Sequence, residues 1–311
     1  MAKRPSRTVS RIRPPVAATE EGWAAPQGVI TLAEQTNLFL DRIRIPENPL
    51  RLSSGMVYGE QAKYLSWEIP LEAHPDQIEL LQMTDMQWGH VGCKRHRTIE
   101  YRDWVLASPH RYMLWTGDNI DAITALSVGT SQENIGTPQR QVFEFCEVWA
   151  PAAHRILGYV GGNHERRSIP TFGDLGILIA TLLRVPYSNG QQLIDLHYGQ
   201  HAPFRITLWH GAGGSRTKGA KAQVLDRFMQ QGDSHLYLMG HLHDAMILPA
   251  WKQIRDPARR RVIYRKSFGA MSSSFMETWG TYGEVAGFAS HDVMMARAVL
   301  TPDGRWELTL R

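Results

Sequence analysis

Short apolar runs and polar clusters alternate along most of the chain. From about residue 64, each apolar run has the length of a strand and is followed by a cluster of Gly, Asp, Asn or His, with helix-like segments between several runs. This alternation predicts an α/β domain whose ligands lie beyond the carboxyl ends of its strands. The candidate strands are Ile78–Met83, Arg111–Thr116, Arg155–Val160, Phe204–Trp209 and Leu236–Met239, and the candidate helices lie near residues 94–107, 137–149, 172–184 and 218–230.

The two ends of the chain follow different patterns. Residues 28–45 are typical of a short amphipathic helix after a Thr cap, ended by two prolines, so we expect an extension packed on the main domain. Beyond residue 260, the apolar runs 262–266, 293–300 and 306–310 indicate antiparallel strands, which a second sheet packed on the first would accommodate. The sequence therefore predicts a flexible basic arm over residues 1–20, an extension with a short helix over 21–63, and one large domain over 64–311.

Composition narrows the class of protein. A chain of 311 residues with 43% hydrophobic and 21% charged residues can bury a sizeable core and is not typical of disorder. No apolar stretch approaches the roughly 18–20 residues of a membrane span, so we expect a soluble, cytoplasmic protein with no membrane partner. The two cysteines, Cys93 and Cys146, are too few for a disulfide framework or a four-thiolate zinc site.

The net charge of +4 is concentrated in one place along the sequence. Five Lys and Arg residues lie within the first thirteen positions, without an acid, and the rest of the chain then holds 29 basic against 30 acidic residues. The arm is interpreted either as a solubilising terminus or as a tail that seeks phosphate groups. Because the remaining chain is near neutral, we expect a small or single-stranded substrate rather than tight binding of a duplex.

Each predicted strand ends in carboxylate, amide or imidazole groups. One such end would be ordinary turn chemistry, but five in a row are improbable by chance. Two divalent cations about 3.5–4 Å apart need one shared carboxylate and several neutral ligands, and Asp118 is the natural bridge between them. The five strand ends are Thr84-Asp85-Met86-Gln87, Gly117-Asp118-Asn119-Ile120-Asp121, Gly161-Gly162-Asn163-His164-Glu165, Trp209-His210-Gly211 and Gly240-His241-Leu242-His243.

These blocks, in this order, resemble the calcineurin-like metallophosphoesterases, whose pattern runs Asp-x-His, Gly-Asp-x-x-Asp, Gly-Asn-His-Glu/Asp, His and Gly-His-x-His. The resemblance covers about residues 78–270. It implies a four-layer α/β/β/α sandwich with two packed mixed sheets and a site for two divalent metal ions, with Mn²⁺ favoured over Mg²⁺, Fe²⁺ or Zn²⁺. The implied ligands are Asp85, Gln87, Asp118 and His243 for one metal, and Asp118, Asn163, His210 and His241 for the other.

The resemblance also implies catalytic roles. His164 is similar to the family's histidine that protonates the leaving oxygen or stabilises the transition state, and Asp121 to the carboxylate that orients it. One position departs from the pattern, because Gln87 stands where the family usually has His. An amide oxygen suits Mn²⁺ or Mg²⁺ better than Zn²⁺, so this site should bind metal more loosely. Two alternatives are that His90 supplies the missing nitrogen, or that the site has become a scaffold.

A phosphate group also needs cations besides the metals. Arg166 follows the third block, and the fourth block continues into a Gly-rich loop that carries Arg216 and Lys218 before a predicted helix. Free backbone N–H groups at a helix N-terminus and basic side chains together can hold an anion. The sequences of residues 213–221, 267–272 and 279–284 resemble those of phosphoesterases encoded by bacteriophages and prophages. That likeness implies action in the cytoplasm of a host cell.

We therefore expect a metal-dependent hydrolase of phosphate esters, and specifically a phosphodiesterase or nuclease. Its substrate would be a nucleic acid or nucleotide, cleaved by in-line attack of a metal-bridging hydroxide. The alternatives are a phosphomonoesterase, acting on a nucleotide or a phosphoprotein, and a non-catalytic binding scaffold on the same fold. No protein partner follows from the sequence.

Overall fold

The computed structural model describes residues 32–53, 60–124, 127 and 131–311, and it divides into two units, residues 1–41 and 42–311. The described part of the first unit, residues 32–41, belongs to helix α1 (Leu32–Arg42), which lies within the segment for which the sequence predicts an amphipathic helix. The predicted basic arm over residues 1–20 lies outside the described residues, as does part of the predicted extension over 21–63.

The second unit contains two mixed β-sheets. Each sheet contains both parallel and antiparallel pairs of neighbouring strands. The seven-stranded sheet has the order β1 (Arg51–Leu52), β2 (Tyr64–Ile69), β7 (Gln192–Tyr198), β8 (Phe204–Trp209), β9 (Leu236–Met239), β11 (Arg261–Met271) and β10 (Met246–Asp256). The six-stranded sheet has the order β13 (Trp306–Leu310), β12 (Ala296–Leu300), β3 (Ile78–Met83), β4 (Arg111–Trp115), β5 (Ile156–Val160) and β6 (Tyr187–Ser188).

The two sheets pack face to face around one core. This core joins Leu80 and Leu114 of the six-stranded sheet to Ile194, Ile206 and Leu238 of the seven-stranded sheet, and all five side chains are buried. The strands β3, β4, β5 and β9 are buried along nearly their whole length, which explains their continuous apolar runs. Such mostly apolar runs could be recognised in the sequence, although β3 also contains the buried polar residues Glu79 and Gln82.

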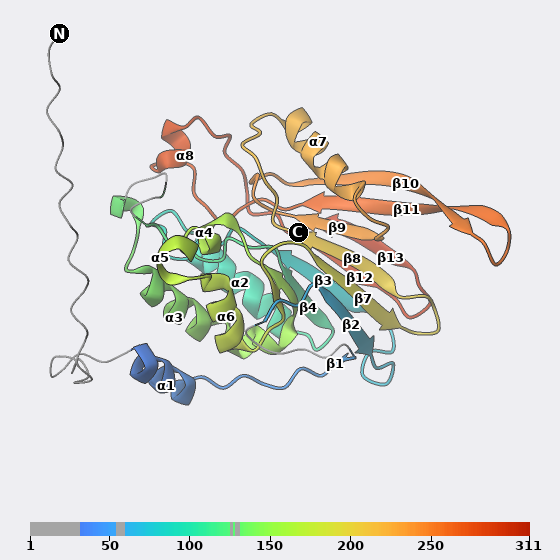
Figure 1. The fold of residues 1–311 in the computed structure, drawn as a ribbon, viewed down its shortest axis with the longest axis horizontal. Coiled ribbons are helices and arrows are strands. Elements are labelled where there is room, and N and C mark those ends of the chain that lie inside the picture. Colours follow the sequence, from blue (N-terminus) through green and yellow to red (C-terminus); the bar gives the residue numbers. More distant parts are fainter. Residues whose placement is uncertain (1–31, 54–59, 125–126, 128–130) are drawn as a thin grey trace, which may run out of the picture. The chain divides into compact units, whose positions relative to one another are not determined.

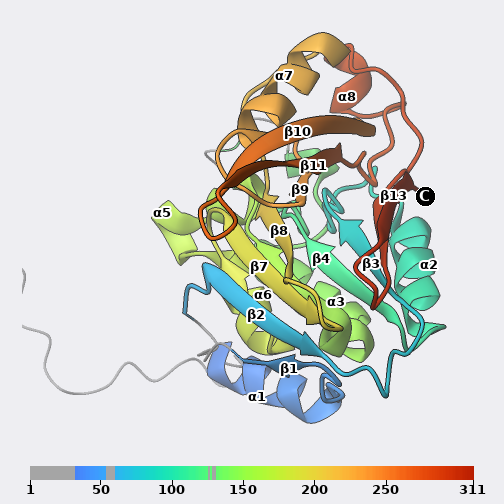
Figure 2. The same ribbon diagram turned by 90° about the vertical axis from the view of Figure 1, so that its right-hand side faces the viewer.

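Helices cover the outer faces of both sheets (Figure 1 and Figure 2). On the six-stranded sheet, Trp115 of β4 packs edge-to-face against Phe145 and Trp149 of α3, at ring-centroid distances of 5.4 and 5.2 Å. On the seven-stranded sheet, Phe228 of α7 packs against Tyr237 of β9. The four-layer α/β/β/α sandwich expected from the sequence is confirmed. The helices are α2 (Arg95–Leu106), α3 (Pro138–Trp149), α4 (Asn163–Arg166), α5 (Ile169–Phe172), α6 (Leu175–Leu183), α7 (Lys218–Met229) and α8 (Tyr282–Val285), with 3-10 turns η1 (Ser131–Glu133) and η2 (Ala150–Arg155).

The predicted elements match the structure best where the strands are buried. All five predicted strands and all four predicted helices of the α/β half are present. The strands β3, β8 and β9 have the predicted ends, and the ends of the other elements differ by at most three residues. The strand β10 was not predicted, because Pro249 and several charged residues interrupt its apolar pattern. Pro249 is tolerated since β10 lies at the edge of its sheet, where a ladder hydrogen bond can be lost. Among the helices that the structure describes, none is long and apolar enough to cross a membrane.

Candidate metal centre

The loops that follow β3, β4, β5, β8 and β9 meet at one edge of the sandwich. The backbone N–H of Asp85 donates to the Gly117 carbonyl at 2.9 Å, and the N–H of His241 donates to Asp85 Oδ2, also at 2.9 Å. Beneath them, the buried Gln82 amide donates to Thr116 Oγ1 at 2.8 Å and to the Met239 carbonyl at 2.9 Å, which ties the two sheets together. Blocks that lie far apart in the sequence therefore form one hydrogen-bonded site.

The backbone is unusual at the candidate ligands. Eight non-glycine residues in the described part of the chain have positive φ angles, and five of them are candidate ligands. A left-handed conformation costs about 1–3 kcal/mol per residue, so it persists only where its surroundings enforce it. The concentration of this strain in one place indicates a functional demand on where the side chains point. The five are Asp85 (49°), Gln87 (45°), Asp118 (53°), His241 (69°) and His243 (49°).

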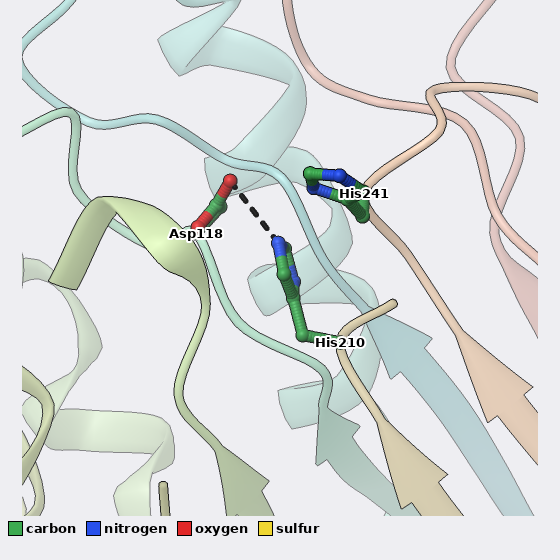
Figure 3. Close-up of side chains that lie close together, drawn as sticks. All are labelled: Asp118, His210 and His241. Carbon is green, nitrogen blue, oxygen red and sulfur yellow. Dashed lines mark ion pairs between the residues drawn. The ribbon is translucent and has the colours of Figure 1, made fainter. Parts of the chain in front are cut away.

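Asp118, His210 and His241 form the tightest group of candidate ligands (Figure 3). One ligand atom from each lies within 4.8 Å of the others. Asp118 Oδ2 is 3.2 Å from His210 Nε2, and Asn163 Oδ1 is 3.0 Å from the same nitrogen. Asp118 and His210 are each only 1% exposed. We call these four residues, Asp118, Asn163, His210 and His241, the Asp118 half of the centre.

The hydrogen bonds of His210 show what this group can bind. Its Nδ1–H donates to the Thr116 carbonyl at 2.7 Å, so Nε2 faces two oxygen atoms that can only accept. Burial lowers the pKa of His210, but the carboxylates of Asp118 and Asp85 outweigh it and raise the pKa to about 9. A proton or a cation must therefore occupy the space between these atoms. Carboxylate, amide and imidazole donors together suit a divalent transition metal.

His241 completes the Asp118 half from the next loop. Its Nε2–H donates to the Gly213 carbonyl at 2.8 Å, which leaves Nδ1 as the nitrogen that can bind a cation. Glycine is required beside it, because a Cβ on Gly240 would collide with Thr84 and Asp85 side chains. The close approach of these two loops therefore depends on Gly240.

Asp85, Gln87 and His243, here called the Asp85 half, lie in the neighbouring part of the centre. Asp85 Oδ1 is 3.1 Å from His243 Nε2, and Asp85 Oδ2 accepts from Thr84 Oγ1 at 2.6 Å. Burial raises the pKa of Asp85, but the charges of His243 and His210 outweigh it and lower the pKa. The His243 side chain is 28% exposed, whereas Asp85 and Gln87 are buried. Gln87 lies at the site, with its amide nitrogen 3.5 Å from His164 Nε2.

His90 does not take the place of the missing histidine. Its Nδ1 accepts a hydrogen bond from the Gly92 N–H at 2.9 Å, and its Nε2 lies 3.6 Å from the carboxylate of Glu133. Both ring nitrogens thus have partners away from Asp85. The alternative in which His90 supplies the nitrogen that Gln87 lacks is not supported.

His164 is held with one nitrogen directed at the centre. Its Nδ1 lies 3.0 Å from Asp121 Oδ1 and 2.9 Å from the Asp121 carbonyl, so Nδ1 carries a proton that it donates to Asp121. Its Nε2 lies 3.6 Å from Asp118 Oδ2. Burial lowers the pKa of His164, while the Asp118 charge and the Asp121 hydrogen bond outweigh it and raise the pKa. This arrangement lets His164 give a proton toward a group bound at the centre.

The predicted phosphate-binding residues Arg166 and Arg216 bond to backbone carbonyls. Arg166 donates from Nε to the Gly162 carbonyl and from a terminal nitrogen to the Asn189 carbonyl, each at 3.0 Å. Arg216 donates to the Ala286 carbonyl at 3.0 Å, and Lys218 is exposed at the first turn of α7. Within the described parts of the chain, none of the three forms a hydrogen bond or ion pair with a candidate ligand.

Glu165 is a residue of the site to which the sequence analysis gave no role. Its fully buried carboxylate accepts from the N–H groups of Asp118 (3.0 Å), Asn119 (2.8 Å) and Gly162 (2.9 Å), and from the Tyr159 hydroxyl (3.0 Å). Burial and the Asp118 charge raise the pKa of Glu165, and the Asn119 N–H opposes this shift. The sequence could have indicated a role for Glu165. It is the third residue of a helix after the N-cap Gly162, which is the capping-box position.

His291 is a second residue without a predicted role at the site. Its ring centroid lies 6.2 Å from that of His243, and its Nε2 is 2.8 Å from Ser274 Oγ. Burial and the charge of His243 lower the pKa of His291. No motif surrounds His291 in the sequence, so only the fold could bring it beside a candidate ligand.

Comparison with known proteins finds similar solved structures. A metallophosphoesterase from Sphaerobacter thermophilus is 14% identical with a TM-score of 0.35, over 75% of this chain and 87% of that one. A protein serine/threonine phosphatase from Saccharomyces cerevisiae is 10% identical with a TM-score of 0.36, over 89% and 86%. An NAD nucleotidase from Haemophilus influenzae is 13% identical with a TM-score of 0.33, over 75% of this chain but only 49% of that one. No protein-family model and no curated protein sequence matches the chain.

Proposed function

We propose that this chain is a metal-dependent phosphodiesterase that acts on a nucleic acid or nucleotide. The observation that carries the proposal is the convergence of Asp118, His210 and His241 within 4.8 Å, with His164 Nε2 3.6 Å from Asp118. Ligands for a cation and a group able to donate a proton thus face the same point. The sequence resemblance to the calcineurin-like metallophosphoesterases supports the same reaction class.

The two halves would hold two divalent ions that share Asp118. The Asp118 half would hold one ion, and Asp85, Gln87 and His243 would hold the other together with Asp118. When bound, the metals would supply an activated water and positive charge for the phosphoryl oxygens. Mn²⁺ is the favoured metal, because the carboxylate and amide oxygens are harder ligands than Zn²⁺ prefers.

The chain's own residues define the remaining chemistry. His164, oriented by its Nδ1–H bond to Asp121, would protonate the leaving oxygen or stabilise negative charge on it. Glu165 fixes the backbone of Asp118, and therefore the direction of the shared carboxylate. The burial of Asp118 and His210 excludes water and strengthens these electrostatic interactions.

A phosphodiester fits the site better than a phosphomonoester. A monoester carries up to two negative charges at neutral pH, and proteins commonly hold such groups with Arg forks whose donors are free. Here Arg166 and Arg216 each donate to backbone carbonyls, which leaves fewer of their donors for a phosphate group. A diester carries a single charge, which two metal ions and His164 can offset. The likeness of residues 213–221 to phage-encoded phosphoesterases extends the proposal to an enzyme of a host cytoplasm.

The test is hydrolysis of bis-p-nitrophenyl phosphate against p-nitrophenyl phosphate. Protein stripped of metal would be refilled with Mn²⁺, Mg²⁺ or Zn²⁺, alongside the variants Asp118→Asn and Asp103→Asn. Asp103 is an exposed control of the same chemistry, paired with Arg102 on α2. We expect cleavage of the diester that depends on Mn²⁺, survives Asp103→Asn and is lost in Asp118→Asn. Faster cleavage of the monoester would establish a phosphomonoesterase, and no turnover of either ester would favour the scaffold.

A further inference from the structure

The hairpin formed by β10 and β11 extends beyond the rest of its sheet (Figure 1). The two strands pair over eleven residues, from Met246 opposite Met271 to Asp256 opposite Arg261. Only the last four residues of β11, Phe268–Met271, also pair with β9. At about 3.4 Å per residue, the part of β11 without this third strand is about 24 Å long. Such a projecting hairpin needs a reason beyond the packing of the core.

One face of this projection is open to solvent. Directly opposed residues of an antiparallel pair point to the same face, and three such pairs define the exposed hairpin face. Trp251, Tyr264 and Val262 on this face are 66%, 65% and 54% exposed. The pairs are Trp251 with Lys266, Gln253 with Tyr264, and Arg255 with Val262.

The opposite face of the hairpin is fixed to the body of the unit. Lys252 donates to the Met229 and Gly232 carbonyls and to the Tyr237 hydroxyl. Arg265 donates to the Asp233 carbonyl. These contacts determine which side of the hairpin turns outward, so the exposed aromatic residues are not displaced core residues.

The hairpin also concentrates positive charge. Residues 251–266 contain seven Lys and Arg residues and one acid, Asp256, although the chain beyond residue 13 is near neutral as a whole. Asp256 pairs with Arg259 and Arg261. Arg255, Arg260 and Lys266 form no ion pair with any described residue. Cations without ion-pair partners beside exposed aromatic rings indicate a polyanion that also carries flat rings.

We propose that the exposed hairpin face binds single-stranded nucleic acid. Trp251 and Tyr264 are diagonal neighbours, about 7–8 Å apart between backbones, and can stack on bases, while Arg255, Arg260 and Lys266 neutralise phosphates. A single strand presents the faces of its bases for stacking, whereas a duplex hides them. A second copy of the chain is a poor occupant, because two hairpins with the same charge repel each other.

The position of the hairpin relates it to the candidate metal centre. β10 begins three residues after His243, and β11 ends three residues before Ser274, the partner of His291. A strand bound along the hairpin would therefore lead toward the centre. Single-stranded nucleic acid would then be the substrate class of the proposed phosphodiesterase. This inference rests on the proposed function, but binding to the hairpin itself needs no hydrolysis.

Fluorescence anisotropy with a labelled 20-nucleotide DNA tests the proposal. The full chain with Asp118→Asn would be titrated in Mn²⁺, and the wild-type chain in EDTA, so that no cleavage interferes. The charge variant is Arg255→Gln/Arg260→Gln/Lys266→Gln, and the stacking variant is Trp251→Ala/Tyr264→Ala. The matched control, Lys3→Gln/Arg4→Gln/Arg7→Gln, removes the same number of charges from the N-terminal arm. Circular dichroism melting checks that each variant is folded.

We expect the stacking variant to weaken binding at least about tenfold. The charge variant should also weaken binding. The slope of log affinity against log salt should become smaller by about 2, because each of the three lost phosphate contacts contributes about 0.7 to the slope. The control should change affinity less than the charge variant does. Folded hairpin variants that bind like wild type, or an arm variant that alone loses binding, would overturn the proposal.

Two further outcomes are decisive. Equal or tighter binding of a 20-base-pair duplex would overturn the assignment to single strands. A dimer in light scattering that the hairpin variants convert to monomer, without loss of DNA binding, would assign the face to self-association instead. The proposed function is tested separately. If the chain binds DNA but never hydrolyses bis-p-nitrophenyl phosphate, the catalytic proposal is overturned and the hairpin site is retained.

Discussion

The Asp118 half and the Asp85 half of the candidate metal centre use similar residues but hold them differently. In the Asp118 half, Asp118 and His210 are each 1% exposed, and the second nitrogens of His210 and His241 donate to backbone carbonyls. In the Asp85 half, the His243 side chain is 28% exposed and Gln87 supplies an amide in place of an imidazole. Each half has two buried ligands and at least one half-buried ligand, so the halves differ mainly in ligand type and in the backbone bonds that orient the imidazoles.

This difference teaches how two adjacent sites can bind the same metal with unequal strength. A ligand whose orientation is fixed by a neighbouring hydrogen bond loses less freedom when it binds, and burial strengthens its attraction for a cation. The Asp118 half should therefore retain its metal, while the Asp85 half exchanges metal with solvent. The shared Asp118 carboxylate makes each half depend on the other.

The largest effect should follow from Asp118→Asn, since that substitution removes charge from both halves. We expect both Mn²⁺ binding events to weaken by more than about 100-fold, so that neither is resolved by isothermal titration calorimetry. The exposed Asp103→Asn variant should still show two events. A single event of unchanged affinity in Asp118→Asn would show that the carboxylate is not shared.

A pair of histidine variants separates the two halves. His210→Ala should abolish the tighter Mn²⁺ event, whereas His243→Ala should abolish only the weaker one, because each histidine contacts the carboxylate of its own half at 3.2 and 3.1 Å. Titration calorimetry of both variants beside wild type measures this directly. The comparison breaks if His243→Ala removes the tighter event, since the Asp85 half would then be the stronger site.

The support of Asp118 by Glu165 predicts a smaller effect. Glu165→Gln presents an amide NH₂ to donors of the Asp118 and Gly162 backbone, and one buried acceptor is lost. We expect diester hydrolysis to fall about 10- to 100-fold and the melting temperature to fall by about 2–10 °C. Glu100→Gln on the surface of α2, where Glu100 pairs with Arg97, is the control. Unchanged hydrolysis at a lowered melting temperature would make Glu165 purely structural.

The fold was predictable where burial makes a strand continuously apolar. The buried strands β3, β4, β5 and β9 are mostly apolar. In β7, buried residues alternate with exposed or half-buried ones, and in β10 half-buried residues alternate with exposed ones. The charge of the hairpin escaped the sequence analysis for a related reason. A total over the whole chain averages the seven basic residues at 251–266 with acids elsewhere, whereas a count within this segment shows the excess.

Prediction of the site was limited in a different way. Motif residues such as Asp118 and His210 stand at strand ends, so their convergence follows from the topology of parallel strands. The directions in which the side chains point do not follow from the strand topology. The donors of Arg166 and Arg216 bond to carbonyls of their own surroundings, and His291 reaches His243 through a loop without a motif.

The smallest expected effect concerns Gln87, the position that most distinguishes the two halves. Gln87→His would give the Asp85 half an imidazole, which Zn²⁺ prefers to an amide oxygen, so the weaker site should bind Zn²⁺ about tenfold more tightly, or about 1.4 kcal/mol. The tighter event should not change, because no ligand of the Asp118 half is altered. Competition between Zn²⁺ and a chromogenic chelator measures both affinities. The buried Gln82, which is bonded to Thr116 and Met239, is left unchanged in this variant. If the new histidine leaves the weaker affinity unchanged, residue 87 does not contact the metal, and the looseness of the Asp85 half arises from the exposure of His243 alone.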